Sequence, residues 1–148
     1  MTRRSLTITV LAAGVLAVVA TSTYAAGFFH SVRDPETKKE CGACHMVYPP
    51  SLMPARSWEK IIGSLENHFG ENASLPEPAR QKILAFMTAN AGDSGAADSW
   101  FMRGVRDTDT PPRITEMPFW RSIHGGFPIT AFKRASVKKR GNCIGCHG

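Results

Sequence analysis

The sequence predicts a small, mainly α-helical fold with extended loops. Three segments carry the spacing and the end signals of short helices. Residues 54–70 repeat apolar side chains at helical intervals and stop at a glycine. Residues 74–92 open with the capping-box pattern Ser-Leu-Pro-Glu and also end near a glycine. Residues 117–124 have a proline suited to a first helical turn and are followed by two glycines.

The first 25 residues predict a signal peptide. Two arginines near the start precede an apolar run, Leu6 to Ala20, and small residues follow it. The run is about 15 residues long, shorter than the roughly 20 residues that span a bilayer. We therefore expect export, with cleavage after Ala25 or Ala26. An uncleaved membrane anchor is the alternative.

The remaining chain predicts one cooperative structure made of two units. Residues 26–92 form an N-terminal helical unit, and the polar residues 93–115 form a connecting loop. Residues 116–148 form a C-terminal unit that has too little chain to fold alone. Within the loop, the apolar residues 100–102 are expected to pack between the units.

The four cysteines form two Cys-x-x-Cys-His motifs, at residues 41–45 and 143–147. In an exported protein, cysteines usually form disulfides. A four-cysteine zinc site and a thioredoxin-like redox pair are further alternative interpretations of these motifs. A structural zinc site needs no histidine after each pair, and a redox motif is not expected twice in so small a chain. The histidine after both pairs instead indicates covalent haem attachment. The residues expected to form thioethers are Cys41, Cys44, Cys143 and Cys146, with His45 and His147 as proximal iron ligands.

Two haem c groups refine the predicted fold class to a small cytochrome c-like helical fold holding two covalently bound haems, with extended loops. Each iron then needs a second axial ligand. His68 lies on the apolar stripe of the helix predicted over residues 54–70, and His124 ends the segment 117–124 beside Trp120. A histidine on a buried face is usually a hydrogen-bonded core residue. In a haem protein short of distal ligands it becomes a candidate ligand, so we predict His68 and His124 as the distal metal ligands.

Other side chains compete for these positions. His30 follows the predicted cleavage point closely and is expected to be solvated. Met87 falls on the inner face of its predicted helix and is expected to pack in the core. Met53, between two prolines, is the main methionine alternative, and it would raise the potential of its haem. Which distal histidine serves which haem stays open.

Positive charge is concentrated at the C-terminal end. No acidic residue follows Glu116. The basic residues after it are Arg121, Lys133, Arg134, Lys138, Lys139 and Arg140. They either neutralise haem propionates and solvate the surface, or form a docking face for an acidic partner beside the second haem. Export argues against nucleic acid as that partner.

The motifs together resemble the bacterial dihaem cytochrome c family, often abbreviated DHC. The similar stretches are Glu40 to Pro50, Leu52 to Trp58, Asn67 to Leu75, Pro112 to Thr115, Trp120 to His124 and Asn142 to His147. The resemblance implies a periplasmic electron carrier with bis-histidine haems, whose distal ligands map to His68 and His124. It also implies two partners, a membrane b-type cytochrome and a small soluble c-type haem protein that binds oxygen.

From the residues we expect an electron-transfer protein with no small-molecule substrate. Four histidines suffice to close both iron sites, and no acid–base pair accompanies either motif. A dihaem peroxidase or reductase, with one open haem site, is the enzyme alternative. A haem-based gas sensor usually carries a signalling domain, which this chain does not show.

Overall fold

The computed structural model describes residues 32–95 and 99–148. The predicted signal peptide and His30 lie outside these residues. The α-helices are α2 (Pro35–Cys41), α3 (Ala55–Ile62), α4 (Glu77–Ala89), α5 (Pro118–His124), α6 (Ile129–Phe132) and α7 (Ile144–His147). The 3₁₀ turns are η1 (Pro50–Leu52), η2 (Leu65–Asn67), η3 (Trp100–Met102) and η4 (Ile114–Glu116). No strand occurs among the described residues, so the mainly α fold class is confirmed.

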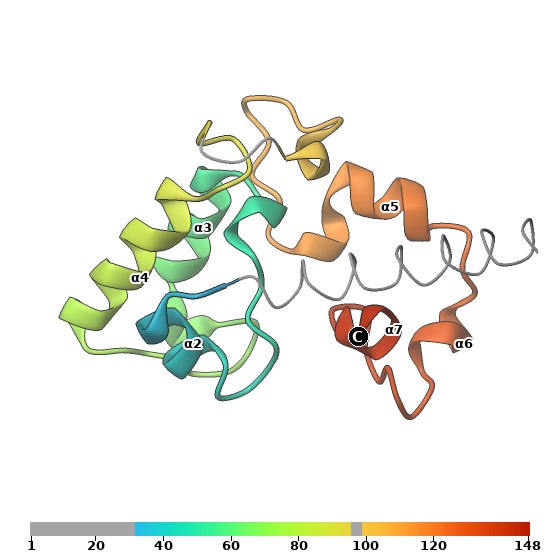
Figure 1. Cartoon of the computed structure of the whole chain (residues 1–148), viewed down its shortest axis with the longest axis horizontal. Coiled ribbons are helices and arrows are strands. Elements are labelled where there is room, and N and C mark those ends of the chain that lie inside the picture. Colours follow the sequence, from blue (N-terminus) through green and yellow to red (C-terminus); the bar gives the residue numbers. More distant parts are fainter. Residues whose placement is uncertain (1–31, 96–98) are drawn as a thin grey trace, which may run out of the picture.

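The helices gather into two groups along the chain. Helices α2, α3 and α4 lie together on one side of the molecule, and α5, α6 and α7 lie on the other (Figure 1). The 3₁₀ turn η3 contacts both groups, because it touches η1 as well as α5. Phe101 in this turn is buried, and its ring lies 5.4 Å from that of Phe119. Phe101 and Met102 thus pack against the shared core between the two groups, as predicted, whereas Trp100 is 46 % exposed.

One apolar cluster runs through both groups. It combines side chains from the N-terminal helices, from η3 and from α5, so the two parts of the chain share a core. Its buried members are Leu52, Met53, Trp58, Ile62, Ile83, Met87, Ala91, Phe101, Ile114, Met117 and Trp120. Met87 is among them, as expected. Met53 is only 1 % exposed and also belongs to this core.

The helix predicted over residues 54–70 is shorter than the apolar spacing suggested. Helix α3 ends at Ile62, and the Gly63 amide closes its last turn with a 2.8 Å hydrogen bond to the Glu59 carbonyl. Ser64 then adopts φ −136°, which breaks the helical path. The chain continues through the 3₁₀ turn η2, and His68 follows that turn. The prediction that His68 lies on a helix face was therefore wrong.

Helix α4 also differs from its predicted start and end. It begins at Glu77 after Pro76, with no side-chain cap, and ends at Ala89 rather than near Gly92. The Ser74 amide instead donates to the side chain of Asn72, so a local turn replaces the predicted capping box. Helix α5 has its expected bounds, with Pro118 as its first residue and Gly125 after its last.

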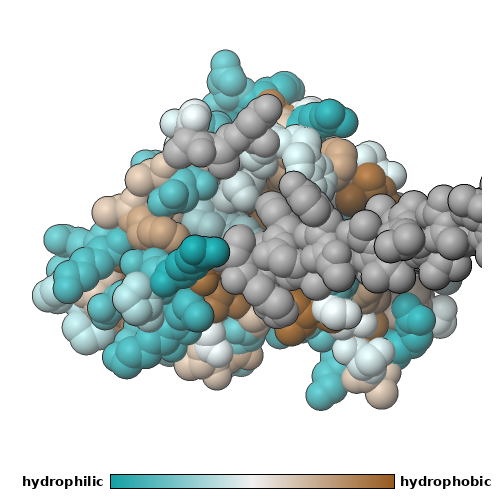
Figure 2. Space-filling model, viewed as in Figure 1, coloured by the Kyte–Doolittle hydropathy of each residue, from teal (hydrophilic) through white to brown (hydrophobic). Residues whose placement is uncertain are grey.

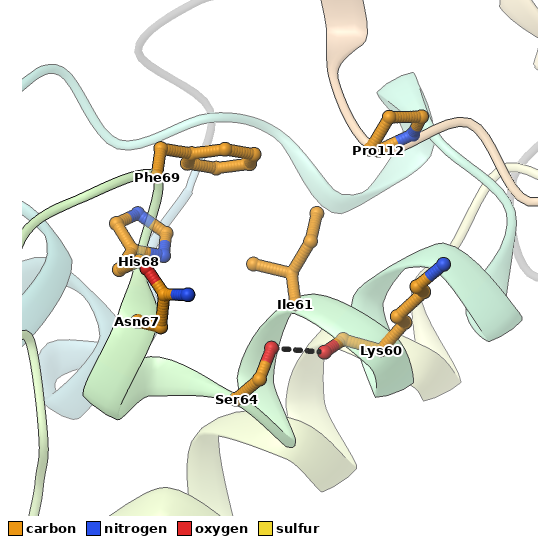
Figure 3. A pocket seen from close by; sticks show the side chains of 7 residues that line it. All are labelled: Lys60, Ile61, Ser64, Asn67, His68, Phe69 and Pro112. Carbon is orange, nitrogen blue, oxygen red and sulfur yellow. Dashed lines mark hydrogen bonds between the residues drawn. The ribbon is translucent and has the colours of Figure 1, made fainter.

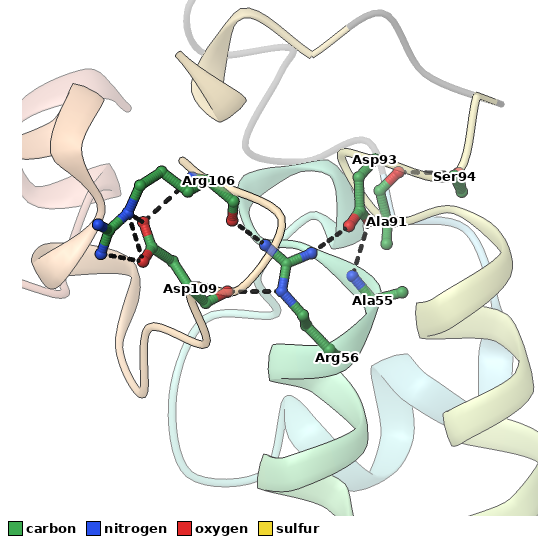
Figure 4. Close-up of polar contacts among 7 residues, drawn as sticks. All are labelled: Ala55, Arg56, Ala91, Asp93, Ser94, Arg106 and Asp109. Carbon is green, nitrogen blue, oxygen red and sulfur yellow. Dashed lines mark hydrogen bonds and ion pairs between the residues drawn. The ribbon is translucent and has the colours of Figure 1, made fainter. Parts of the chain in front are cut away.

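Arg56 at the start of α3 joins three segments (Figure 4). Its guanidinium pairs with the Asp93 carboxylate at 2.8 Å and donates to the carbonyls of Arg106 and Asp109 at 2.7 and 2.6 Å. Asp93 also accepts a 2.7 Å hydrogen bond from the Ala55 amide. The planar fork of arginine suits several acceptors at once. The connecting segment is thereby fastened to the N-terminal helices.

We expect Arg56→Ala to lower the free energy of unfolding by about 1–3 kcal/mol, because it removes three charge-assisted hydrogen bonds from a partly buried group. Urea unfolding of the haem-loaded protein, followed by circular dichroism, measures the change. Arg80→Ala is the matched control, since the Arg80 side chain is exposed to the same extent as that of Arg56 (29 % against 28 %) but pairs with Glu77 of its own helix, so its loss should have a much smaller effect. Equal losses from both variants contradict this account of Arg56.

Candidate haem-binding sites

The first cysteine motif bridges a helix end and a turn. Asp34 caps α2 by accepting a 2.8 Å hydrogen bond from the Thr37 amide, and Pro35 follows at the first position. Cys41 is the last residue of this helix, whereas Cys44 and His45 lie in the turn after Gly42. The motif therefore starts from a capped helix and leaves it after one residue.

The second motif forms the short helix α7, with Cys143 at its N-cap and His147 as its last residue. The two motifs share one asymmetry of exposure. The first cysteine of each pair is half-buried and the second is exposed. Burial raises the pKa of the Cys41 thiol, and it raises the pKa of Cys143 to about 11. No disulfide joins any of the four cysteines, which all lie among the described residues, so the disulfide alternative is not seen.

His68 is held by a tight turn. Its amide donates to the Glu71 carbonyl at 2.7 Å, and the Glu71 amide donates back at 3.3 Å. The two central residues, Phe69 and Gly70, have φ of 58° and 102°, as in type I′ turns. A bulky residue at positive φ costs about 1 kcal/mol, so the surrounding packing must offset that strain.

The Phe69 ring supplies this packing. It meets the His68 ring edge-on at 4.9 Å, and the Arg113 guanidinium lies 4.3 Å above its centre. Arg113 comes from the segment before η4, so a distant part of the chain holds the turn in place. The role of Phe69 could not be predicted from the sequence, because no local pattern marks a phenylalanine at positive φ.

The structure brings His68 to His45. Their ring centres lie 6.2 Å apart and their planes differ by 19°. The His45 Nδ1 lies 2.6 Å from the Met46 carbonyl oxygen, which accepts hydrogen bonds only. Nδ1 therefore carries the proton in the neutral ring, which leaves the lone pair of Nε2 for a metal. Burial, and then the nearness of His45, lower the pKa of His68, which favours the neutral imidazole that binds metals.

His124 and His147 form the second pair. Their ring centres lie 6.1 Å apart, with planes 82° from parallel. The His124 Nδ1 lies 3.1 Å from the Trp120 carbonyl oxygen, one helical turn earlier, and its ring stacks on the Trp120 ring at 4.6 Å. Burial lowers the pKa of His124; the hydrogen bond to Trp120 opposes this effect and His147 adds to it. The ring of His124 is thus fixed by the helix that carries it.

Both separations fit an iron between the rings. A metal–nitrogen bond of about 2 Å on each side, with about 1.1–1.2 Å from each nitrogen to its ring centre, predicts roughly 6.3 Å. The observed 6.2 and 6.1 Å agree with this value. We call Cys41, Cys44, His45 and His68 the first haem site, and Cys143, Cys146, His124 and His147 the second haem site.

The alternatives to haem do not match these positions. No group of three or more histidine, cysteine or acidic side chains could hold a metal by itself among residues 32–95 and 99–148. The two cysteine pairs therefore do not combine into a zinc site. Met53, the methionine that competes with the histidines for a distal position, is buried in the apolar core.

Two cavities lie next to the distal histidines. The one beside His68 measures about 110 Å³ and is bounded by Ile61, Phe69 and Pro112 (Figure 3). It is too small for a porphyrin, and His45 does not line it. The cavity beside His124 measures about 500 Å³, within the range of ligand pockets. Its other lining residues are Thr115, Glu116, Trp120, Arg121, Gly125, Phe127, Phe132 and Arg140.

Comparison with known proteins agrees with this geometry. The family model for dihaem cytochrome c matches residues 37–148. The chain belongs to the dihaem cytochrome c family. It therefore carries two covalently bound haem c groups, each with an iron, as the two cysteine motifs predicted. Among curated proteins, none shows significant sequence similarity to this chain.

Solved structures of dihaem cytochromes share the fold. A dihaem cytochrome c from Rhodobacter sphaeroides is 44 % identical, with a TM-score of 0.71, covering 78 % of this chain and 90 % of that one. A second structure, of DHC purified from Rhodobacter sphaeroides, is 40 % identical, with a TM-score of 0.65 and the same coverage. A dihaem cytochrome c from Shewanella baltica is 32 % identical, with a TM-score of 0.60, covering 74 % and 76 %.

Removing a distal histidine should open one haem. We expect the ferrous wild-type protein to bind no carbon monoxide, and His68→Ala and His124→Ala each to bind one equivalent, because each loses one axial ligand. The absorption spectrum under carbon monoxide measures this. Met53→Leu is the control and should leave both sites closed. If neither histidine variant opens a site, or if Met53→Leu does, the ligand assignment is wrong.

The two ring-plane angles should also be visible in the ferric protein. Parallel imidazole planes donate into the same iron d orbital and separate it in energy from its partner, whereas perpendicular planes treat both orbitals alike. Electron paramagnetic resonance should therefore show a rhombic low-spin signal from the first haem site and a more axial, strongly anisotropic one from the second. His68→Ala should remove the former and His124→Ala the latter. Two signals with the same g values contradict the geometry.

Proposed function

We propose that this dihaem cytochrome is an exported electron carrier with two bis-histidine haems, and that it relays electrons between redox proteins. The proposal rests on the two histidine pairs. The ring centres lie 6.2 Å apart in the pair His45–His68 and 6.1 Å apart in the pair His124–His147. When bound, each haem supplies an iron that accepts and gives up one electron. The protein contributes the axial ligands, their orientation and their surroundings.

Two histidine ligands at each iron favour electron transfer over catalysis, because they leave no axial position open to a substrate. A peroxidase or reductase needs an iron position that a small molecule can reach, with an acid–base residue beside it. The hydrogen bonds from His45 to Met46 and from His124 to Trp120 orient one ligand in each pair. Ligands held in this way stay in place when the iron changes charge. Bis-histidine ligation also implies potentials well below those of His/Met cytochromes.

The charge of the C-terminal unit supports docking of an acidic partner near the second haem site. All six basic side chains after Glu116 are exposed, and two of them, Arg121 and Arg140, line the cavity beside His124. Arg140 also lies 5.5 Å above the Phe132 ring. Positive charge beside an exposed cofactor steers an anionic partner toward it and speeds encounter.

Apolar side chains accompany these cations. Ile123, Phe127 and Ile129 are each about half exposed. On the face in Figure 2, hydrophobic side chains occur beside α5 and in the centre, and hydrophilic ones dominate the outer edges. Apolar contact framed by charge is typical of protein interfaces.

Export and the two partners complete the proposal. The signal-like N-terminus supports export, and the family resemblance supports a periplasmic relay from a membrane b-type cytochrome to a small soluble c-type haem protein. Within residues 32–95 and 99–148, none of the helices has the length and apolar character of a membrane span.

Reversing charge beside the second haem site should slow oxidation by an anion. Lys138→Glu/Lys139→Glu is expected to reduce the rate with hexacyanoferrate(III) roughly three- to tenfold at low salt and to flatten its salt dependence. Stopped-flow absorbance of the reduced protein measures this rate.

Lys38→Glu/Lys82→Glu is the matched control, because it changes the net charge equally on exposed positions of α2 and α4. It should slow oxidation much less. Equal slowing by both variants contradicts a docking face in the C-terminal unit and favours a role for these cations in solvation alone.

A further inference from the structure

Tyr48 contacts both haem-attachment segments. Its ring centre lies 5.1 Å from that of His45, the proximal histidine of the first haem site. Its hydroxyl donates a 2.8 Å hydrogen bond to the carbonyl of Gly141, 93 residues later in the chain. Gly141 lies two residues before Cys143, which begins the second motif. One side chain therefore joins the two segments to which the haems are attached.

The fit between Tyr48 and Gly141 leaves no room for a side chain at position 141. A Cβ atom there would lie 2.7 Å from the Tyr48 hydroxyl oxygen, closer than real Cβ contacts. Any larger residue at 141 must therefore displace the Tyr48 hydroxyl and disturb the hydrogen bond. Tyr48 is itself half-buried, so its hydroxyl depends on this acceptor more than an exposed hydroxyl would.

We propose that Tyr48 and Gly141 form a junction that fixes the two haem-attachment segments relative to each other, and that Tyr48 thereby sets the rate of electron transfer between the haems. We call this pair the junction. The inference rests on the proposed function as an electron carrier. Tyr48 acts here as a positioning residue.

Covalent attachment explains why the junction matters. A haem held by two thioethers and a proximal histidine follows the backbone of its motif. The probability of electron tunnelling falls steeply with the distance between donor and acceptor. A hydrogen bond that keeps the two motifs at one separation therefore keeps the transfer rate high and uniform. Loss of the bond allows a more open arrangement in which transfer is slower.

Tyr48→Phe tests the junction with little change in packing, since it keeps the ring against His45 and removes the hydroxyl. Loss of the hydrogen bond costs about 1 kcal/mol, which shifts the equilibrium about fivefold from the joined arrangement of the two motifs toward the open one. Electron exchange between the haems should therefore slow by up to about fivefold. Exchange broadening of haem methyl resonances in half-reduced protein measures this rate, and a dilution series separates exchange within one molecule from exchange between molecules. Amide hydrogen exchange of residues 141–147 should also become faster, a readout that does not involve electrons.

A double-mutant cycle makes the test specific. Gly141→Ala should slow the exchange between haems in the wild-type background. It should add little in a Tyr48→Leu background, because the atom that it displaces is already absent. Ser99→Ala is the control. It removes another hydroxyl-to-carbonyl hydrogen bond, 2.6 Å from Ser99 to Ser51, that lies outside both motifs, and it should leave the exchange unchanged.

Unchanged exchange within the molecule and unchanged amide protection in Tyr48→Phe would overturn the junction while leaving the carrier function intact. Additive effects of Gly141→Ala and Tyr48→Leu would overturn it as well. A wild-type protein whose haems exchange electrons only between molecules, at a rate proportional to concentration, contradicts the relay itself. The two failures are thus distinguished by the dilution series.

Discussion

The proposed bis-histidine ligation requires two imidazole rings to face each other about 6 Å apart at each haem site, and much of the fold serves this requirement. The ring-centre separations of 6.2 and 6.1 Å match the space that one coordinated iron would take. One histidine of each pair follows a cysteine pair and is placed by attachment. The distal histidine comes from elsewhere in the chain, so the tertiary structure has to place it opposite the first.

The two sites meet this requirement with different local structures. His68 sits on a turn whose strained Phe69 is held by packing against Arg113. His124 ends a regular helix and is fixed by a stack on Trp120 and a hydrogen bond to its carbonyl. The strained turn depends on contacts from the connecting segment, and the helix depends mainly on its own residues. We therefore expect the first distal ligand to be the more sensitive to loosening of the tertiary structure.

The sequence predicted what depends on neighbouring residues. Both cysteine motifs are local patterns, and α5 is bounded by Pro118 and Gly125, so attachment and this helix could be predicted. Apolar spacing continued past Gly63, which led to a helix that the structure ends at Ile62. The partner of each distal histidine depends on how distant segments pack, and the contact between Tyr48 and Gly141 spans 93 residues. Neither has a signature in the chain.

The central claim is that two histidines close each iron. Iron X-ray absorption of the ferric and ferrous protein tests it most directly, because the first coordination shell distinguishes nitrogen from sulfur. The account predicts six nitrogen neighbours at every iron in both oxidation states, with no sulfur. A sulfur neighbour, as methionine ligation would give, or an average coordination below six contradicts it.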